Sequence, residues 1–92
     1  MADTIPCVFV GIDVSGDHLD LARHDRSDVQ RFPNTEEGIA QILTLVRSWP
    51  VSRIAIESTG KLERPLLSTL IAGSQPACLV NPDRVRKFAQ AL

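Results

Sequence analysis

Residues 7–14 form a nearly continuous hydrophobic run near the start of the chain. Such a run, rich in β-branched residues, is typical of a strand buried on both faces. Residues 18–23 alternate between apolar and polar, which predicts a strand with one solvated face, and residues 29–32 predict a short third strand. Turn-forming residues at 15–17 and 25–28 separate the three runs. The pattern therefore predicts an antiparallel meander of three strands.

The next segment has the periodicity of a helix. Asn34 is a good N-cap residue, and Glu37 three positions later resembles a capping box. Apolar residues then recur with the spacing of one buried helical face, namely Ile39, Ile42, Leu43, Val46 and Trp49. Gly38 weakens the prediction by about 1 kcal/mol relative to alanine, and Pro50 ends the helix.

A strand and a second helix follow. The strand is a short apolar segment at 53–57 that ends in a carboxylate, and residues 58–60 turn the chain. The helix covers residues 62–71, with Pro65 tolerable only in its first turn. Gly73 is expected just past the helix end, where glycine commonly takes a left-handed conformation.

The remaining residues complete an α/β pattern. Residues 77–80 predict a last strand, and Asn81-Pro82 predicts the start of a third helix. The order βββαβαβα predicts a ribonuclease-H-like mixed five-stranded sheet with helices on both faces. With right-handed crossovers, the first strand lies centrally and the 53–57 strand pairs parallel beside it. Because no helix stop follows Ala91-Leu92, we expect residues 1–92 to be a single domain cut off within its last helix.

Composition limits the function classes without naming one. No run approaches the roughly 18 apolar residues of a membrane span, and the N-terminus lacks a secretory signal pattern, so a cytoplasmic protein is expected. Net charge is −1, but residues 1–57 hold five Arg against nine Asp or Glu, whereas residues 58–92 hold five Lys or Arg against two acids. The basic residues of the second part fit either phosphate contacts or a solvated face, and they are Lys61, Arg64, Arg84, Arg86 and Lys87.

Asp13 and Glu57 carry the most chemical information. Each interrupts or ends an apolar strand, where an unpaired carboxylate would be costly to bury. On parallel strands about 4.8 Å apart, both acids would emerge at the C-terminal edge of the sheet, where ligands bind in open α/β sheets. Oxygen-only ligation there favours Mg²⁺ or Mn²⁺ over zinc. Each acid taken alone also fits an ordinary strand end or a turn cap.

Other polar residues have simpler interpretations. Ser15, Ser58 and Thr59 fit turn or backbone-capping roles, since no base that could activate Ser58 is identifiable nearby. His18 and His24 lie six residues apart, do not form a chelating pair and are expected at the surface.

Several different short sequence motifs are spread over nearly the whole chain. They are Val10-Gly11-Ile12-Asp13-Val14-Ser15, Phe32-Pro33-Asn34-Thr35, Glu57-Ser58-Thr59-Gly60, Glu63-Arg64-Pro65-Leu66, Val80-Asn81-Pro82, Val85-Arg86 and Phe88-Ala89. In their order and spacing these blocks resemble the N-terminal RuvC-like domain of the DEDD insertion-sequence transposases, a group that includes the Piv-type pilin-gene-inverting recombinases. Each block is weak alone, whereas the ordered set is a strong signal.

The resemblance implies metal-dependent DNA recombination by a transposase or a site-specific invertase. In that family Asp13 and Glu57 correspond to the first two acids of a D-E-D-D site for Mg²⁺ or Mn²⁺. The last two aspartates and a C-terminal domain with a serine nucleophile would lie beyond residue 92, so this part alone is expected to be inactive. DNA is the implied partner, some members use a guide RNA, and the full-length bacterial protein is expected to form a homo-oligomer.

Departures from the family pattern concern local contacts rather than the acids, with Gly16 in place of a common lysine and Lys61-Leu62 in place of Gly-Tyr. Three other hypotheses stay open. A Holliday-junction-resolvase-like nuclease would keep the fold and use water as the nucleophile. Residues 11–16 faintly resemble the first phosphate loop of actin-like ATPases. A non-catalytic oligomerisation domain would keep the fold without the metal.

Overall fold

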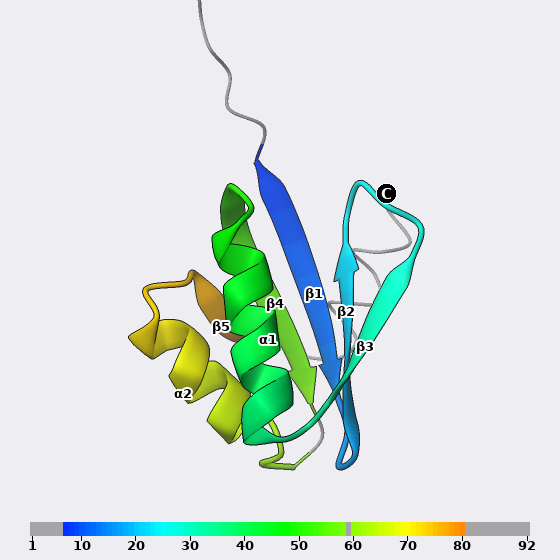
Figure 1. The fold of residues 1–92 in the computed structure, drawn as a ribbon, viewed down its shortest axis with the longest axis vertical. Coiled ribbons are helices and arrows are strands. Elements are labelled where there is room, and N and C mark those ends of the chain that lie inside the picture. The colour runs from blue at the N-terminus through cyan, green and yellow to red at the C-terminus, as the bar shows by residue number, and fades with distance from the viewer. Residues whose placement is uncertain (1–6, 59, 81–92) are drawn as a thin grey trace, which may run out of the picture.

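The computed structural model describes residues 7–58 and 60–80. Its strands are β1 (Val8–Val14), β2 (His18–Arg23), β3 (Val29–Pro33), β4 (Val51–Ser58) and β5 (Ala77–Val80), and its helices are α1 (Glu36–Arg47) and α2 (Arg64–Ala72). These elements follow one another in the predicted order (Figure 1). The third helix, predicted to begin at residue 82, lies outside the described residues.

The strands form one mixed sheet in the order β3-β2-β1-β4-β5. β1 pairs antiparallel with β2, and β2 pairs antiparallel with β3, as expected for strands joined by tight turns. On its other side β1 pairs parallel with β4, and β5 continues the sheet parallel to β4. The prediction of a central first strand with a parallel neighbour is confirmed, although β4 begins earlier than predicted, at Val51 (Figure 1).

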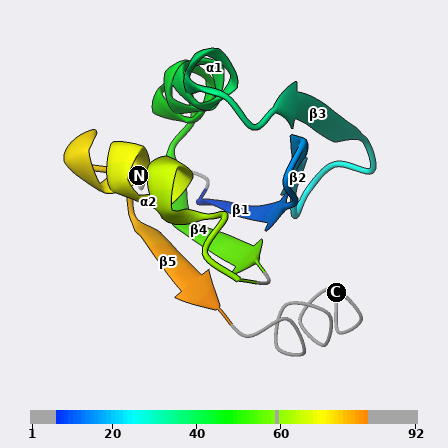
Figure 2. The same ribbon diagram turned by 90° about the horizontal axis from the view of Figure 1, so that it is seen from below.

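The hydrophobic core fills one face of this sheet. Both α1 and α2 lie on the same side of the strands and cover that face (Figure 2). The core joins alternate strand residues to the inner stripe of each helix, namely Val8, Val10, Ile12, Val14, Leu19, Leu21, Ile39, Ile42, Val46, Ile54, Ile56, Leu66 and Leu70. Neither of the two described helices is long and apolar enough to cross a membrane.

The prediction that β1 is buried on both faces is wrong. Its residues alternate between buried and more exposed positions, with Phe9 38 % exposed on the face that α1 and α2 do not cover. Single apolar residues at a surface are ordinary, so an apolar run alone does not require two covered faces. Helices were predicted on both faces, and the predicted third helix lies outside the described residues.

The N-terminus of α1 differs from the prediction by one residue. Thr35, rather than Asn34, is the N-cap, because its hydroxyl accepts a hydrogen bond of 3.1 Å from the Gly38 N–H. Asn34 instead donates its side-chain amide to the Ser15 carbonyl oxygen at 2.8 Å and ties the start of α1 to the β1–β2 turn. Glu37 is therefore not in a capping box, although the helix dipole favours its charge in the first turn.

Two glycines let α1 pack closely against its neighbours. A Cβ on Gly38 would overlap the carbonyl oxygen of Pro33, so glycine allows the first turn of α1 to approach the end of β3. A Cβ on Gly73 would lie 2.7 Å from Leu43 Cδ1, where α2 meets α1. Gly73 directly follows the last residue of α2, which confirms the predicted helix stop; its φ is −84°, and Ser74 takes the positive φ of 64°.

Replacing Gly38 by alanine should therefore destabilise the fold. We expect a loss of about 1–3 kcal/mol, the usual cost of overpacking, even though alanine is intrinsically the better helix former by about 1 kcal/mol. Gly11→Ala is the matched control, since an added Cβ there meets none of the described residues within 4 Å. Urea unfolding followed by circular dichroism measures both variants, and equal stability of the two would contradict the close approach at Pro33.

Candidate functional site

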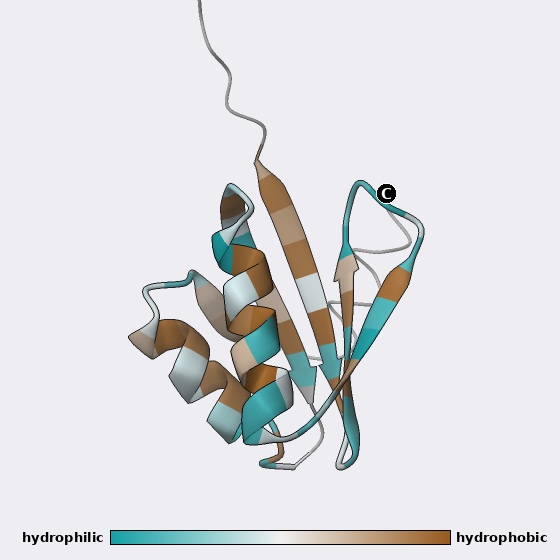
Figure 3. Cartoon of the chain, in the orientation of Figure 1, coloured by the Kyte–Doolittle hydropathy of each residue, from teal (hydrophilic) through white to brown (hydrophobic). Residues whose placement is uncertain are grey.

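Asp13 and Glu57 lie side by side at the C-terminal ends of two adjacent parallel strands. They are directly paired in the register of β1 and β4, and paired residues on strands about 4.8 Å apart point to the same face of a sheet. Asp13 is exposed and Glu57 is half-buried, on the face away from α1 and α2. Figure 3 shows adjacent hydrophilic bands at the lower ends of both strands, below mostly hydrophobic stretches. The predicted adjacency of the two acids is confirmed.

Burial of neighbouring residues fixes this arrangement. Ile12 and Ile56 precede the two acids, are paired with each other, and are 2 % and 0 % exposed in the core. A slip of one residue in either strand would bring an isoleucine to the solvent face and turn a carboxylate into the core. The hydrophobic pattern of the strands therefore holds both acids on one face and at one level.

The two carboxylates fit a hard divalent cation. Among the described residues, neither Asp13 nor Glu57 takes part in an ion pair. The described part of the chain contains no group of three or more metal-binding side chains, so it contributes two carboxylates. Mg²⁺ commonly uses one or two protein carboxylates and completes its shell with water and phosphate oxygens. The donor chemistry thus suits Mg²⁺ or Mn²⁺ rather than zinc.

Comparison with protein families identifies the domain. A family model described as a transposase, the DEDD transposase of IS110 type, matches residues 10–92, a range that includes both acids. The chain belongs to this transposase family. Comparison with curated proteins gives no match. Membership relates the domain to DNA transposition, and the mixed sheet is consistent with the ribonuclease-H-like fold that the sequence predicted.

In the transposase domain, two further residues extend the line of the acids across the sheet. Asp13 is paired with Asp20 on β2, and Asp20 is paired with Arg31 on β3. Arg31, Asp20, Asp13 and Glu57 therefore occupy four neighbouring strands at one level of the exposed face. This row was not predicted from the sequence. The alternation in residues 18–23 indicated that Asp20 faces solvent, but its neighbours depend on the register between strands.

Arg31 binds Asp20 with two parallel hydrogen bonds. Its Nε lies 2.8 Å from Oδ1 and its Nη2 lies 3.0 Å from Oδ2. The hydrogen bond from Arg31 lowers the pKa of Asp20; desolvation opposes this shift, and the charges of Arg31 and His18 support it. The same hydrogen bond raises the pKa of Arg31. Asp20 is therefore an ionised and fully paired carboxylate beside Asp13.

The basic residues predicted to contact nucleic acid are only partly described. Lys61 lies exposed in the turn after β4, and Arg64 lies exposed at the first position of α2. Both follow the strand that carries Glu57, so they stay candidates for contacts with phosphates near the acids. Arg84, Arg86 and Lys87 lie outside the described residues.

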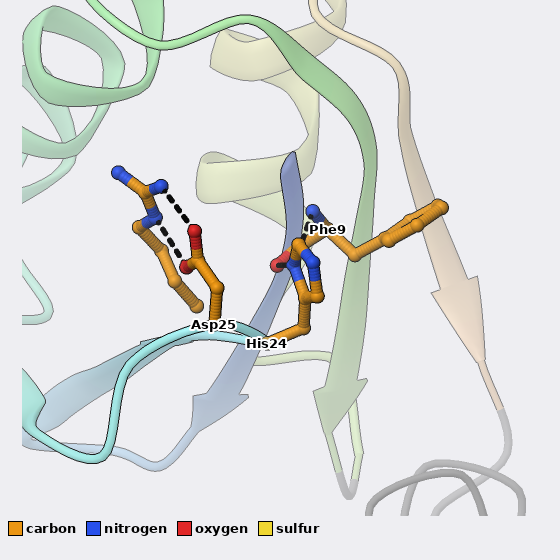
Figure 4. A network of polar contacts seen from close by, with 4 residues as sticks. Phe9, His24 and Asp25 are labelled. Carbon is orange, nitrogen blue, oxygen red and sulfur yellow. Dashed lines mark hydrogen bonds and ion pairs between the residues drawn. The ribbon is translucent and has the colours of Figure 1, made fainter. Parts of the chain in front are cut away.

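Three other polar residues, Ser15, His18 and His24, take part in contacts that hold the strands together. The Ser15 hydroxyl donates to the His18 carbonyl oxygen at 3.0 Å and accepts from the His18 N–H at 3.3 Å, which closes the β1–β2 turn. His18 is half-buried and His24 is exposed. His24 Nδ1 accepts a hydrogen bond of 3.0 Å from the Phe9 N–H, and the two rings meet edge-on with centroids 5.3 Å apart (Figure 4). Thr59 lies outside the described residues.

A second charged group lies at the opposite end of the sheet. Arg23 binds Asp25 with two hydrogen bonds of 3.0 and 2.7 Å, and this contact lowers the pKa of Asp25 (Figure 4). The guanidinium groups of Arg23 and Arg26 lie 4.6 and 5.5 Å from the centroid of the Trp49 ring. Cation–π contacts at these distances are attractive, so the group joins the β2–β3 turn to the segment after α1.

Glu63 is a buried carboxylate that the sequence analysis did not single out. It is 5 % exposed, and its Oε1 has no hydrogen-bond partner among the described residues. It occupies the N-cap position of α2 without a side-chain capping bond. The helix dipole favours negative charge at that end, which offsets part of the cost of burial.

The Asp20–Arg31 pair makes stability depend on pH in a defined direction. Because folding lowers the pKa of Asp20, its contribution is complete above the unfolded value of about 3.9 and is lost as pH falls through the lower folded value. Asp20→Asn should therefore be slightly less stable than the wild type at pH 7, and the difference should shrink below about pH 4. Thermal unfolding across this range measures it, with Asp28→Asn, an exposed carboxylate between β2 and β3, as the control. A difference that stays constant down to pH 2 would contradict this pairing.

Proposed function

We propose that Asp13 and Glu57 bind Mg²⁺ or Mn²⁺ and that this site serves DNA strand cleavage and strand transfer in the transposase. The observation that supports the proposal most directly is the pairing of the two acids in register on an exposed sheet face. Parallel strands bring two ligands to the same edge, where open α/β sheets bind their ligands. A role in a turn or a cap does not require the two acids to be neighbours.

The residues around the acids define how such a site would work. A divalent ion at this position would polarise a phosphodiester and activate the attacking oxygen. The chain would fix the positions of the two carboxylates, because side chains on strands are positioned more precisely than side chains on loops. Glu57 is half-buried, which restricts its side chain, whereas Asp13 is exposed and open to substrate.

DNA is the partner that family membership suggests. Phosphate contacts from Lys and Arg position DNA without reading its sequence, and this role is proposed for Lys61, Arg64, Arg84, Arg86 and Lys87. A guide RNA, a homo-oligomeric assembly and a bacterial cytoplasmic location are further expectations from the resemblance to DEDD transposases.

Removing one ligand charge should abolish recombination without unfolding the domain. In the full-length transposase, Asp13→Asn and Glu57→Gln should each lower the rate of strand cleavage at least about a hundredfold. The reason is that a bound metal ion supplies several kcal/mol of transition-state stabilisation. Both changes keep the side-chain volume and remove one charge. Asp28→Asn is the control, an exposed aspartate at the far end of the sheet. Wild-type recombination by either variant would exclude that acid from the mechanism.

The two acids should also be necessary for metal binding by the chain itself. Residues 1–92 should bind Mn²⁺ weakly, because a two-carboxylate site without a bound phosphate leaves the ion most of its water. The EPR signal of free Mn²⁺ measures this binding without any assay of activity. Asp13→Asn and Glu57→Gln should each reduce it, and Asp28→Asn should not. Equal Mn²⁺ binding by all four proteins would place the ion elsewhere.

A further inference from the structure

Asp20 is a third carboxylate beside the proposed ion site, yet its side chain is committed elsewhere. It is paired with Asp13 on one side and with Arg31 on the other. Side chains of directly paired residues have Cβ atoms about 4.5–5.5 Å apart, so Asp20 would come within reach of an ion held by Asp13 if its side chain turned away from Arg31. Both of its oxygens instead contact the Arg31 guanidinium, at 2.8 and 3.0 Å.

Arg31 is well placed to act as the counter-ion of Asp20. Its side chain is 63 % exposed, compared with 24 % for that of Asp20, so the guanidinium reaches the carboxylate from the solvent side of the edge strand β3. Two parallel hydrogen bonds between arginine and a carboxylate fix the orientation of both planes. Without this contact, Asp20 and Asp13 would be like charges directly opposite each other, which is unfavourable in a sheet.

We infer that Arg31 is a positioning residue that keeps Asp20 out of the coordination shell of the divalent ion. The pair cancels its own charge, so β1 and β4 present two carboxylates to the ion rather than three carboxylates from β1, β2 and β4. This inference rests on the proposed ion site at Asp13 and Glu57. It assigns to Arg31 a role that does not require contact with the ion or the substrate.

The consequence is an ion that keeps positions open for its substrate. A catalytic divalent ion binds phosphate oxygens and the attacking oxygen in positions that protein ligands leave free. A carboxylate from β2, added to Asp13, Glu57 and the two further aspartates that the family resemblance implies, would occupy one of these positions and neutralise more of the ion's charge. The site formed by Asp13 and Glu57 should therefore bind the metal ion more weakly than a site that also included Asp20.

A cycle of charge changes separates this role from a purely structural one. Arg31→Gln releases Asp20 and should tighten Mn²⁺ binding about threefold to tenfold, as expected for one extra charge within several ångströms near a surface. Asp20→Asn leaves Arg31 uncompensated and should weaken Mn²⁺ binding. The effect of Asp20→Asn should be smaller than that of Arg31→Gln, because the Arg31 guanidinium is two strands, or about 10 Å, from Asp13. This distance is close to the Debye length at about 0.1 M salt. In the double variant, positions 20 and 31 together carry no net charge, as in the wild type, so its affinity for Mn²⁺ should be about that of the wild type.

The experiment is a titration of residues 1–92 and these variants with Mn²⁺ alone, followed by the EPR signal of the free ion at constant pH and salt. Circular dichroism and thermal unfolding show whether each variant is folded. Arg31→Lys keeps the charge and should stay close to the wild type in Mn²⁺ affinity. A structural role alone would lower stability in both single variants without moving the Mn²⁺ affinity in opposite directions.

The outcomes distinguish this inference from the proposed function. If Asp13→Asn and Glu57→Gln lose Mn²⁺ binding but Arg31→Gln and Asp20→Asn bind as the wild type does, the role of Arg31 is wrong and the ion site stands. If Arg31→Gln weakens binding, the inference is overturned in the same way. If Asp13→Asn and Glu57→Gln leave binding unchanged, the ion site itself fails, and the inference fails with it.

Discussion

The parallel pairing of β1 with β4 is the constraint on which the candidate site depends. It is held by aliphatic side chains on the inner face, among them Ile12, Ile54 and Ile56, which are at most 2 % exposed. Burying each such side chain contributes about 1.5–3 kcal/mol, so a shift in register would lose several of these contributions at once. The same register places Asp13 beside Glu57. The core therefore sets the geometry of the acids, although neither acid belongs to it.

The sequence predicted the order of the elements and the position of the two acids because both depend on local patterns. Alternation and turn residues define the strands, and a carboxylate after an apolar run marks the point where a strand leaves the core. Right-handed crossovers then placed the 53–57 strand parallel beside β1. Adjacency of Asp13 and Glu57 followed from these local features, whereas their metal-binding role stays a prediction.

Features that depend on contacts between distant segments were beyond the sequence patterns. Asn34 is as good an N-cap as Thr35 by residue type, and what decides between them is the contact of Asn34 with the Ser15 carbonyl. Gly38 was expected to weaken α1, but it is needed for the approach to Pro33. In each case the deciding atom lies on another element, so the periodicity of one segment contains no signal for it.

Among the described residues, charge partners distinguish Asp13 and Glu57 from two other carboxylates. Two described aspartates, Asp20 and Asp25, are each bound by both ends of an arginine fork. Asp13 lies directly beside Asp20 and yet has no ion pair among the described residues. An arginine facing Asp13 would compete with a metal ion, so the lack of an ion pair at Asp13 within the described residues is compatible with the proposed metal site.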